Sequence, residues 1–219
     1  REIGALCRKR GVLFHTDAVQ AAGHLAIDVQ RDNIDMLSLS AHKFHGPKGI
    51  GLLFAKSNIQ LTSLIRGGGQ ERGKRAGTEN LPGIIGLAAA LKDAQENMQQ
   101  NTAYITGLRD ALRNGLDKID GADFNGSREH CLPGTVNYSF QGLNGEALLS
   151  LLSNEGICCS SGSACSAGSL EPSHVLLALG LSHETAQSAL RFSLCEYNTM
   201  DEVQTIITKV TEAINRLRR

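Results

Sequence analysis

The sequence predicts a mixed α/β protein in two parts. In the first half, short apolar runs alternate with helical patterns and glycine-rich loops, which is typical of an α/β sheet. In the second half, short strands and helices follow a polar, glycine-containing stretch at 121–133, which is typical of an α+β arrangement. We therefore expect an α/β domain over residues 1–120 and a smaller α+β domain over 121–219.

The composition is that of a globular protein and excludes several function classes. Of 219 residues, 41% are hydrophobic and 20% charged, so a core can form. The 22 basic residues balance the 22 acidic ones, which argues against binding nucleic acid or acidic membranes through bulk charge. Aromatic residues make up only 4%, with no Trp, so base-stacking platforms are not expected.

The sequence shows no membrane or secretion signal. No apolar run approaches the roughly 18 residues that a membrane helix requires, and the N-terminus lacks a signal-peptide core. The six cysteines have no regular spacing and no paired Cys-x-x-Cys, so we expect reduced thiols without a zinc or iron-sulfur site. These features predict a cytoplasmic protein without a membrane partner.

Each element of the first half follows from a local pattern. Ile3, Leu6 and Cys7 at helical spacing indicate a helix already under way, so the chain is expected to begin within the fold. Apolar runs predict strands, and apolar stripes predict helices, with Asn80 as the N-cap of the first helix and Pro82 in its first turn. The expected strands are 12–17, 34–40 and 50–54, and the expected helices are 82–98 and 102–116.

The second half is predicted in the same way. Thr199 and Glu202 fit a capping box at the start of a closing helix with a clear apolar stripe. The expected strands are 135–140, 156–160 and 189–194, and the other expected helices are 145–153 and 172–179. Within the first half, the segment 66–80 carries five glycines and is predicted to be a long functional loop.

Lys43 is the first candidate for chemistry. It lies just past the carboxyl end of the strand predicted at 34–40, in a Gly/Pro loop, and ligands of open α/β sheets bind at that edge. A lysine there suits a Schiff-base role. Taken alone, a solvated loop lysine is the more frequent interpretation, and Lys48 in the same loop has nothing to distinguish it.

Asp17 ends the preceding predicted strand at the same edge, and Gln20 follows one turn later. A carboxylate in this place can hold the protonated ring nitrogen of pyridoxal phosphate. An N-cap for a helix starting near Ala18 is an equally good local interpretation. Three further residues, each weak alone because Ser and Thr in loops usually bond their own backbone, suit a phosphate: Ser40, His42 and Thr78.

Two candidates lie in the second half. Cys165 stands in a run of small residues at 160–169 with no packing reason for a cysteine, which favours a mobile, exposed thiol over a structural one. Arg191 interrupts the apolar strand predicted at 189–194. Its planar fork suits a substrate α-carboxylate, although pairing with a protein carboxylate is slightly favoured on local grounds.

Three separated motifs carry a resemblance to a known family. SAHKFHGPKG at 40–49, GGGQE and RAGTEN within 67–80, and SGSAC at 161–165 occur in the order in which they stand in cysteine desulfurases of the NifS/IscS group, which the sequence resembles from residue 1 to the closing helix. The resemblance covers the C-terminal half or more of such an enzyme. It implies fold type I of the pyridoxal-phosphate (PLP) enzymes, class V aminotransferase branch, with a partial large domain of mainly parallel sheet and a smaller C-terminal domain, in a homodimer.

The resemblance also implies a role for each candidate. Lys43 would bind PLP covalently and move the substrate's α-proton, Asp17 would pair with the ring nitrogen, and Gln20 with the phenolic oxygen. The phosphate would be held by Ser40, His42 and, from the other subunit, Thr78. Arg191 would clamp the carboxylate of L-cysteine. Cys165 as thiolate would take the substrate sulfur as a persulfide and leave alanine.

The implied function is sulfur delivery to an iron-sulfur scaffold or another acceptor protein. The alternatives are selenocysteine lyase or another class V PLP enzyme, and a catalytically inactive truncated subunit. The family's phosphate-binding turn, ring-stacking histidine and an asparagine near the phenolic oxygen have no counterpart in this sequence. Cys195 and Glu196 stand where Gly-Arg is common, and Ser166 and Ala167 where Thr-Ser is common.

Overall fold

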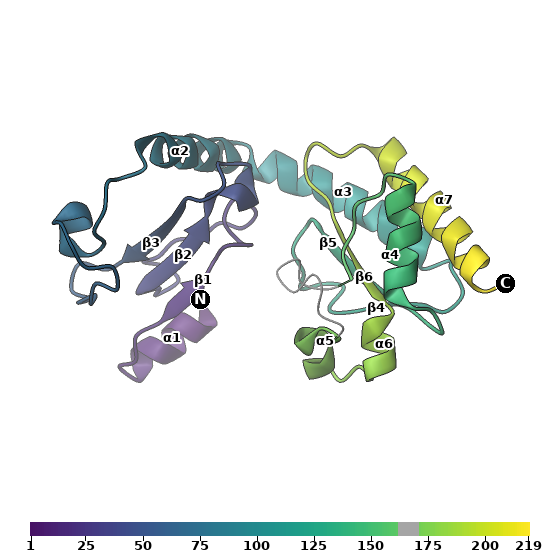
Figure 1. Ribbon diagram of the computed structural model, residues 1–219. Coiled ribbons are helices and arrows are strands. Elements are labelled where there is room, and N and C mark those ends of the chain that lie inside the picture. The colour runs from purple at the N-terminus through teal and green to yellow at the C-terminus, as the bar shows by residue number, and fades with distance from the viewer. Residues whose placement is uncertain (162–170) are drawn as a thin grey trace. The chain divides into compact units, whose positions relative to one another are not determined.

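The chain folds into two compact units, Arg1–Gln99 and Gln100–Arg219. The computed structural model, drawn as a ribbon in Figure 1, describes residues 1–161 and 171–219. The division at Gln99 precedes the boundary that the sequence predicts at 120, because the helix α3 (Met98–Leu116) contributes four buried residues to the core of the second unit. These are Ile105, Leu108, Leu112 and Leu116.

The first unit is built on a three-stranded sheet of order β1-β2-β3. The strands are β1 (His15–Asp17), β2 (Met36–Ser40) and β3 (Gly51–Ala55). β1 and β2 run parallel, with Asp17 opposite Ser38, whereas β3 returns antiparallel beside β2. The parallel pair is the part of the predicted α/β sheet that brings two strand ends to one edge.

Helices and turns complete the first unit. They are α1 (Glu2–Lys9), the 3₁₀ turns η1 (Ala41–Phe44) and η2 (Gln70–Gly73), and α2 (Leu81–Glu96). α2 begins where the sequence predicts, because the Asn80 side chain accepts a hydrogen bond from Gly83 N and Pro82 lies in the first turn. Its Leu87 packs in a cluster with Phe44 and Ala41, so the helix covers the turn that carries Lys43.

The predicted loop at 66–80 contains η2, a short element that the sequence did not predict. Glu71 and Arg72 inside it have positive φ of 50° and 57°, a backbone conformation that composition does not reveal. The segment folds back on itself because Ala76 N donates to Ile65 O at 3.1 Å. Ala76 is buried, whereas Thr78 is exposed.

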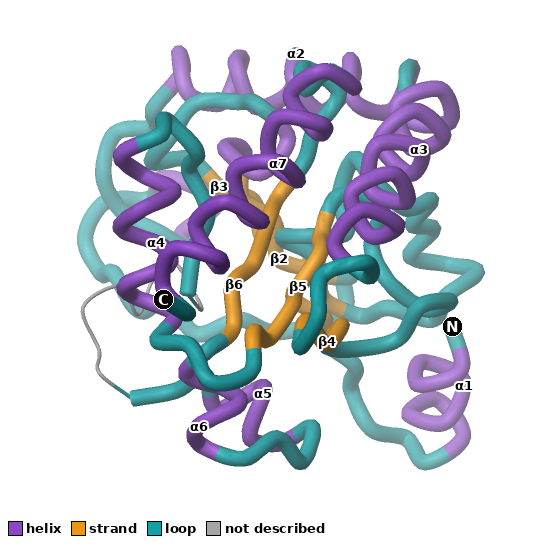
Figure 2. The backbone as a smooth tube through the Cα atoms, turned by 90° about the vertical axis from the view of Figure 1, so that its right-hand side faces the viewer, coloured by secondary structure: helices purple, strands orange, loops and turns teal. Residues whose placement is uncertain are grey.

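The second unit places helices on one face of an antiparallel sheet of order β4-β5-β6. The strands are β4 (Ala122–Phe124), β5 (Thr135–Phe140) and β6 (Ala189–Ser193). Figure 2 shows α3, α4 (Gly145–Asn154) and α7 (Met200–Leu217) gathered on the same side of this sheet. Their buried residues form one core with alternate residues of β5 and β6, among them Val136, Tyr138, Phe140, Leu190 and Phe192.

Three elements of the second unit differ from the sequence prediction. β4 lies inside the polar stretch 121–133, where the sequence predicts a domain boundary and no strand, and a short helix α6 (His183–Gln187) follows α5 (His174–Ala178). The strand predicted at 156–160 is wrong: Gly156 turns the chain at φ 79°, and only Ser160 forms an isolated bridge, to Arg191. β4 depends on its pairing with β5, which periodicity cannot detect. α6 is a five-residue helix whose start is capped locally, because the Ser182 hydroxyl accepts from Thr185 N at 3.1 Å.

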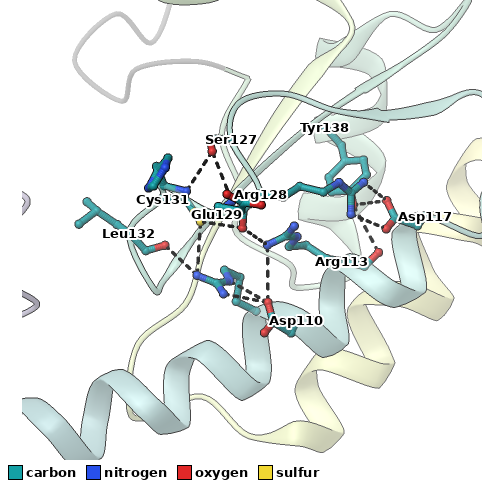
Figure 3. Close-up of polar contacts among 11 residues, drawn as sticks. Asp110, Arg113, Asp117, Ser127, Arg128, Glu129, Cys131, Leu132 and Tyr138 are labelled. Carbon is teal, nitrogen blue, oxygen red and sulfur yellow. Dashed lines mark hydrogen bonds and ion pairs between the residues drawn. The ribbon is translucent and has the colours of Figure 1, made fainter.

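The loop after β4 is held on α3 by charged side chains, as Figure 3 shows. Arg128 donates two hydrogen bonds of 2.8 Å to the Asp117 carboxylate. The Arg113 and Arg128 guanidinium groups lie 4.8 and 5.0 Å from the centre of the Phe124 ring. Within the described part of the chain, no helix is long and apolar enough to cross a membrane.

Candidate active site

The carboxyl ends of β1 and β2 bring four predicted residues to one edge of the first sheet. Ala18 N donates to Ser38 O at 2.9 Å, which continues the parallel ladder one step beyond Asp17. β2 ends at Ser40, and η1 carries His42 and Lys43 immediately afterwards. Residues that stand far apart in the sequence therefore lie at the edge where ligands of α/β sheets bind.

The 3₁₀ turn explains why Lys43 and His42 are accessible. With three residues per turn, Ala41 and Phe44 lie on the same side of η1, and both are buried at 0% and 3% exposure. His42 is exposed and Lys43 half-buried. The turn is closed by a hydrogen bond of 2.8 Å from Gly46 N to Ala41 O, and a side chain at position 46 would lie 2.9 Å from Ala41 Cβ.

Ser40 and His42 form a hydroxyl-imidazole pair. Ser40 Oγ lies 2.9 Å from His42 Nδ1, so the hydroxyl orients the ring and leaves Nε2 at the exposed end. Which atom of the pair donates depends on the histidine tautomer. A hydroxyl and an imidazole fixed side by side after a strand are suitable donors for a phosphate oxygen.

Asp17 caps a turn, which agrees in part with the alternative interpretation that it is an N-cap. Its Oδ1 accepts a hydrogen bond of 2.9 Å from Val19 N, which caps the turn that follows β1. No α-helix starts at Ala18, since residues 19–24 form a series of turns. A carboxylate has up to four acceptor positions, so this one bond leaves room for a ring N–H. Gln20, on the same turn, is exposed.

Arg191 lies in the middle of β6 in the second unit. Its Nε is buried and has no hydrogen-bond partner within the described residues. A buried donor without an acceptor costs roughly 1–3 kcal/mol, so a ligand that supplies an acceptor would recover this free energy. This observation favours the predicted role in binding a carboxylate over that of a purely structural arginine.

Cys165 lies outside the described residues. The described thiols nearest to it in sequence differ from each other: Cys158 is exposed, whereas Cys159 is partly buried. Burial, and to a smaller extent the neighbouring Cys158, raises the pKa of the Cys159 thiol to about 11. Cys159 is therefore a poor nucleophile near neutral pH.

The residues of the first unit fit PLP by their donor chemistry. An amine, a carboxylate and a hydroxyl-imidazole pair at one sheet edge match three polar groups of that cofactor, namely its aldehyde, its ring nitrogen and its phosphate. When bound there, the cofactor would supply an electron sink next to the amino carbon of a substrate. Thr78 is exposed in the segment after η2, and Arg191 belongs to the second unit.

The fold is that of the PLP-dependent enzymes of fold type I. The family model described as class-V aminotransferase matches residues 1–206, and the chain belongs to that family, which is PLP-dependent.

Relatives within the family are cysteine desulfurases. The chain is 48% identical over 221 residues to the cysteine desulfurase IscS of Clostridium botulinum, covering 100% of this chain and 56% of the relative. It is 46% identical over 218 residues to the IscS of Methanosarcina thermophila, covering 100% and 54%. The chain thus spans a little over half the length of these relatives.

Solved structures agree with the sequence relatives. A NifS-like protein from Rickettsia africae matches with a TM-score of 0.91 and 31% identity, covering 98% of this chain and 57% of that one. A second NifS-like protein matches with a TM-score of 0.88 and 39% identity, covering 97% and 55%. The predicted fold class and the resemblance to the NifS/IscS group are both confirmed.

One group of polar residues beside Arg191 was not predicted. Asn125 Nδ2 lies 2.7 Å from Asn137 Oδ1 and 2.8 Å from Ser139 Oγ, and Asn137 is the register partner of Arg191. The period-2 alternation of TVNYSF at 135–140 carries a signal, because Asn137 and Ser139 fall on the face opposite the apolar residues. The link to Asn125 depends on β4, which the sequence did not predict.

Proposed function

We propose that this chain carries the lysine and sulfur-accepting parts of a cysteine desulfurase that converts L-cysteine to L-alanine. The observation that supports the proposal most strongly is that Asp17 ends β1 and Lys43 follows the end of β2, the strand that pairs with β1 in parallel. The names of the relatives, cysteine desulfurase IscS and NifS-like protein, give the reaction class.

In this proposal, residues of the first unit hold the cofactor and move a proton. The Lys43 amine holds PLP covalently, and when freed it moves a proton from the substrate Cα. Asp17 accepts from the ring N–H, and Gln20 donates to the phenolic oxygen. The phosphate is bound by Ser40 and His42, with Thr78 contributed by a second copy in a homodimer.

The sulfur transfer is assigned to Cys165. Its thiolate attacks Sγ of the bound L-cysteine, the Cβ–Sγ bond breaks, and its electron pair ends on Cβ, which takes up a proton to give L-alanine. The former substrate sulfur remains on Cys165 as a persulfide, so no external oxidant or reductant is required. Arg191 binds the substrate carboxylate. We further propose that the persulfide passes to an iron-sulfur scaffold or another acceptor protein in the cytoplasm.

Borohydride reduction of the full-length, PLP-loaded protein tests the lysine assignment. Peptide mass spectrometry should find the pyridoxyl group on Lys43 and not on Lys48, which is exposed in the same loop. Lys43→Ala should abolish both the label and alanine formation, while Lys48→Ala should retain both. An unmodified Lys43 in a protein that still makes alanine would overturn the assignment.

A second experiment separates this function from its alternatives. Cys165→Ser should stop alanine formation from L-cysteine and leave PLP binding intact. If alanine formation from L-cysteine survives the substitution, a lyase of the selenocysteine type or another class V reaction is favoured. A folded, full-length protein that binds no PLP would support an inactive subunit.

A further inference from the structure

A row of polar side chains crosses the sheet of the second unit on the face opposite its core. Along β5, Val136 and Tyr138 are fully buried in the core, so the residue between them, Asn137, belongs to the other face. Along β6, Leu190 and Phe192 are likewise in the core, and Arg191 lies between them. Asn137 and Arg191 are therefore neighbours on the face that the helices α3, α4 and α7 leave open.

The pairing geometry brings these two side chains close together. Arg191 N donates to Ser160 O at 2.6 Å, and Ser160 N donates to Arg191 O at 3.1 Å. Both backbone groups of Arg191 thus point away from β5, which makes Arg191 and Asn137 a non-hydrogen-bonded antiparallel pair. In such pairs the Cα atoms lie about 4.5 Å apart and the side chains are at their closest.

Asn125 fixes which end of the Asn137 amide is presented. The Asn125 amide nitrogen donates to Asn137 Oδ1 at 2.7 Å and to Ser139 Oγ at 2.8 Å. Asn125 N also donates to Asn137 O at 2.9 Å, so backbone and side chain hold the same partner. The carbonyl end of the Asn137 amide is therefore held on the β4 side, and its NH₂ group is directed away from Asn125, on the side of the row where Arg191 lies.

The row thus presents donors around one position. Arg191 offers a guanidinium whose buried Nε lacks an acceptor within the described residues, and Asn137 offers an amide NH₂ beside it. Two neighbouring donors are best satisfied by an anion with two oxygens, that is, a carboxylate. A neutral carbonyl oxygen lacks the negative charge that pairs with the guanidinium, so it would be held less strongly.

We propose that Asn137 is a second hydrogen-bond donor to the α-carboxylate of the amino-acid substrate, and that Asn125 is a positioning residue that orients the Asn137 amide. This inference rests on the proposed function, since it takes Arg191 as the arginine that binds the carboxylate. It assigns selection for a free carboxylate to Arg191 of β6, Asn137 of β5 and the residue that follows β4, Asn125.

Steady-state kinetics of the full-length, PLP-loaded protein test this assignment. Asn137→Asp, which replaces the donor by an acceptor of the same shape, should raise KM for L-cysteine by at least about 10-fold with little change in kcat, as expected for a lost bond to a charged group. Asn125→Ala should raise KM by a smaller factor. For L-cysteinamide, which lacks the carboxylate, both variants should react as the parent protein does.

A matched control lies two register pairs along the same two strands, at the next pair on the same face. Thr135 and Ser193 are opposite each other and exposed on the same face as Asn137 and Arg191, so Thr135→Ala should leave both KM values unchanged. Thermal unfolding of each variant checks the fold. If Asn137→Asp unfolds early, Asn137→Ala, which removes the donor without adding a charge, replaces it and should also raise KM for L-cysteine alone.

A readout without turnover uses the product. On addition of L-alanine to the PLP-loaded protein, the ¹⁵N side-chain resonances of Asn137 and of Arg191 Nε should both shift. In Asn125→Ala the Asn137 shift should shrink while the Arg191 shift remains. The inference would be overturned if the Asn137 resonance did not shift on addition of L-alanine. It would also be overturned if Asn137→Asp and Thr135→Ala changed KM for L-cysteine equally. The proposed function fails separately, if the parent protein forms no alanine from L-cysteine.

Discussion

Tyr138 donates a hydrogen bond of 2.6 Å to Asp117 from a hydroxyl at the end of a fully buried side chain. The same carboxylate holds Arg128, as Figure 3 shows. The Arg128 bonds, more than that of Tyr138, hold the pKa of Asp117 below its ordinary value. Burial, followed by the bond to Asp117, raises the pKa of Tyr138 far above its ordinary value. The cluster joins three parts of the second unit into one polar network: the end of α3, the loop that follows β4, and strand β5.

The second unit should lose stability in acid through Asp117. A carboxyl whose folded-state pKa is lowered stabilises the fold above its unfolded pKa, and this contribution is lost as the pH falls through the folded value. We expect the free energy of unfolding to fall between pH of about 5 and 2. Because the Asp117 side chain is 33% exposed, its ion pair contributes only about 1 kcal/mol.

Urea unfolding at several pH values measures this contribution. Asp117→Asn should lower stability at neutral pH and make it less dependent on acid than in the parent protein. Asp120→Asn, at an exposed residue in the turn after α3, serves as the control and should retain the parent's pH dependence. An acid dependence unaltered by Asp117→Asn would show that other carboxyl groups govern it.

Tyr138→Phe should destabilise the protein by roughly 1 kcal/mol, the net value of one hydrogen bond. The ring remains in the core between Phe124 and Phe140, whose ring centres lie 5.5 and 6.5 Å from that of Tyr138, so no cavity forms. Chemical denaturation should show a lower midpoint with an unchanged slope. A loss of several kcal/mol would mean that the hydroxyl supports the whole network.

The capping box of α7 predicts that two threonine-to-alanine variants differ in stability. The Thr199 hydroxyl accepts from Glu202 N and the Glu202 carboxylate accepts from Thr199 N. Thr199→Ala should cost about 1 kcal/mol. Thr205→Ala, at an exposed position inside the same helix, should be neutral or slightly stabilising, because alanine has the higher helix propensity. Equal midpoints for the two variants would contradict a working cap.

Adjacent cysteines should react at different rates. Cys158 is exposed, and burial raises the pKa of Cys159 to about 11. Pulsed alkylation at pH of about 8, followed by peptide mass spectrometry, should label Cys158 first and Cys159 only when the protein is unfolded, since the thiolate is the reactive form. Comparable labelling of both in the native protein would contradict this difference in burial.

Local signals predicted most of the elements that position the candidate site. The strand at 135–140 and the start of α7 occur where the sequence predicts them, because alternation and a capping box are encoded within a few residues. The same holds for the N-cap of α2. At the first sheet, the predicted strands ending at Asp17 and Ser40 correspond to β1 and β2, which pair in parallel, and the turn of Lys43 follows β2.

By itself, the sequence determined which residues cap the helices and which alternate between the two faces of a strand. It also determined which motifs resemble those of the desulfurases. Only the tertiary structure decided the pairings. β4 has three residues, too few to show a periodicity, and it forms a strand because it pairs with β5. Only through β4 does Asn125 reach Asn137. The physical reason is that sheet hydrogen bonds join residues distant in sequence, and their free energy depends on packing that no local pattern encodes.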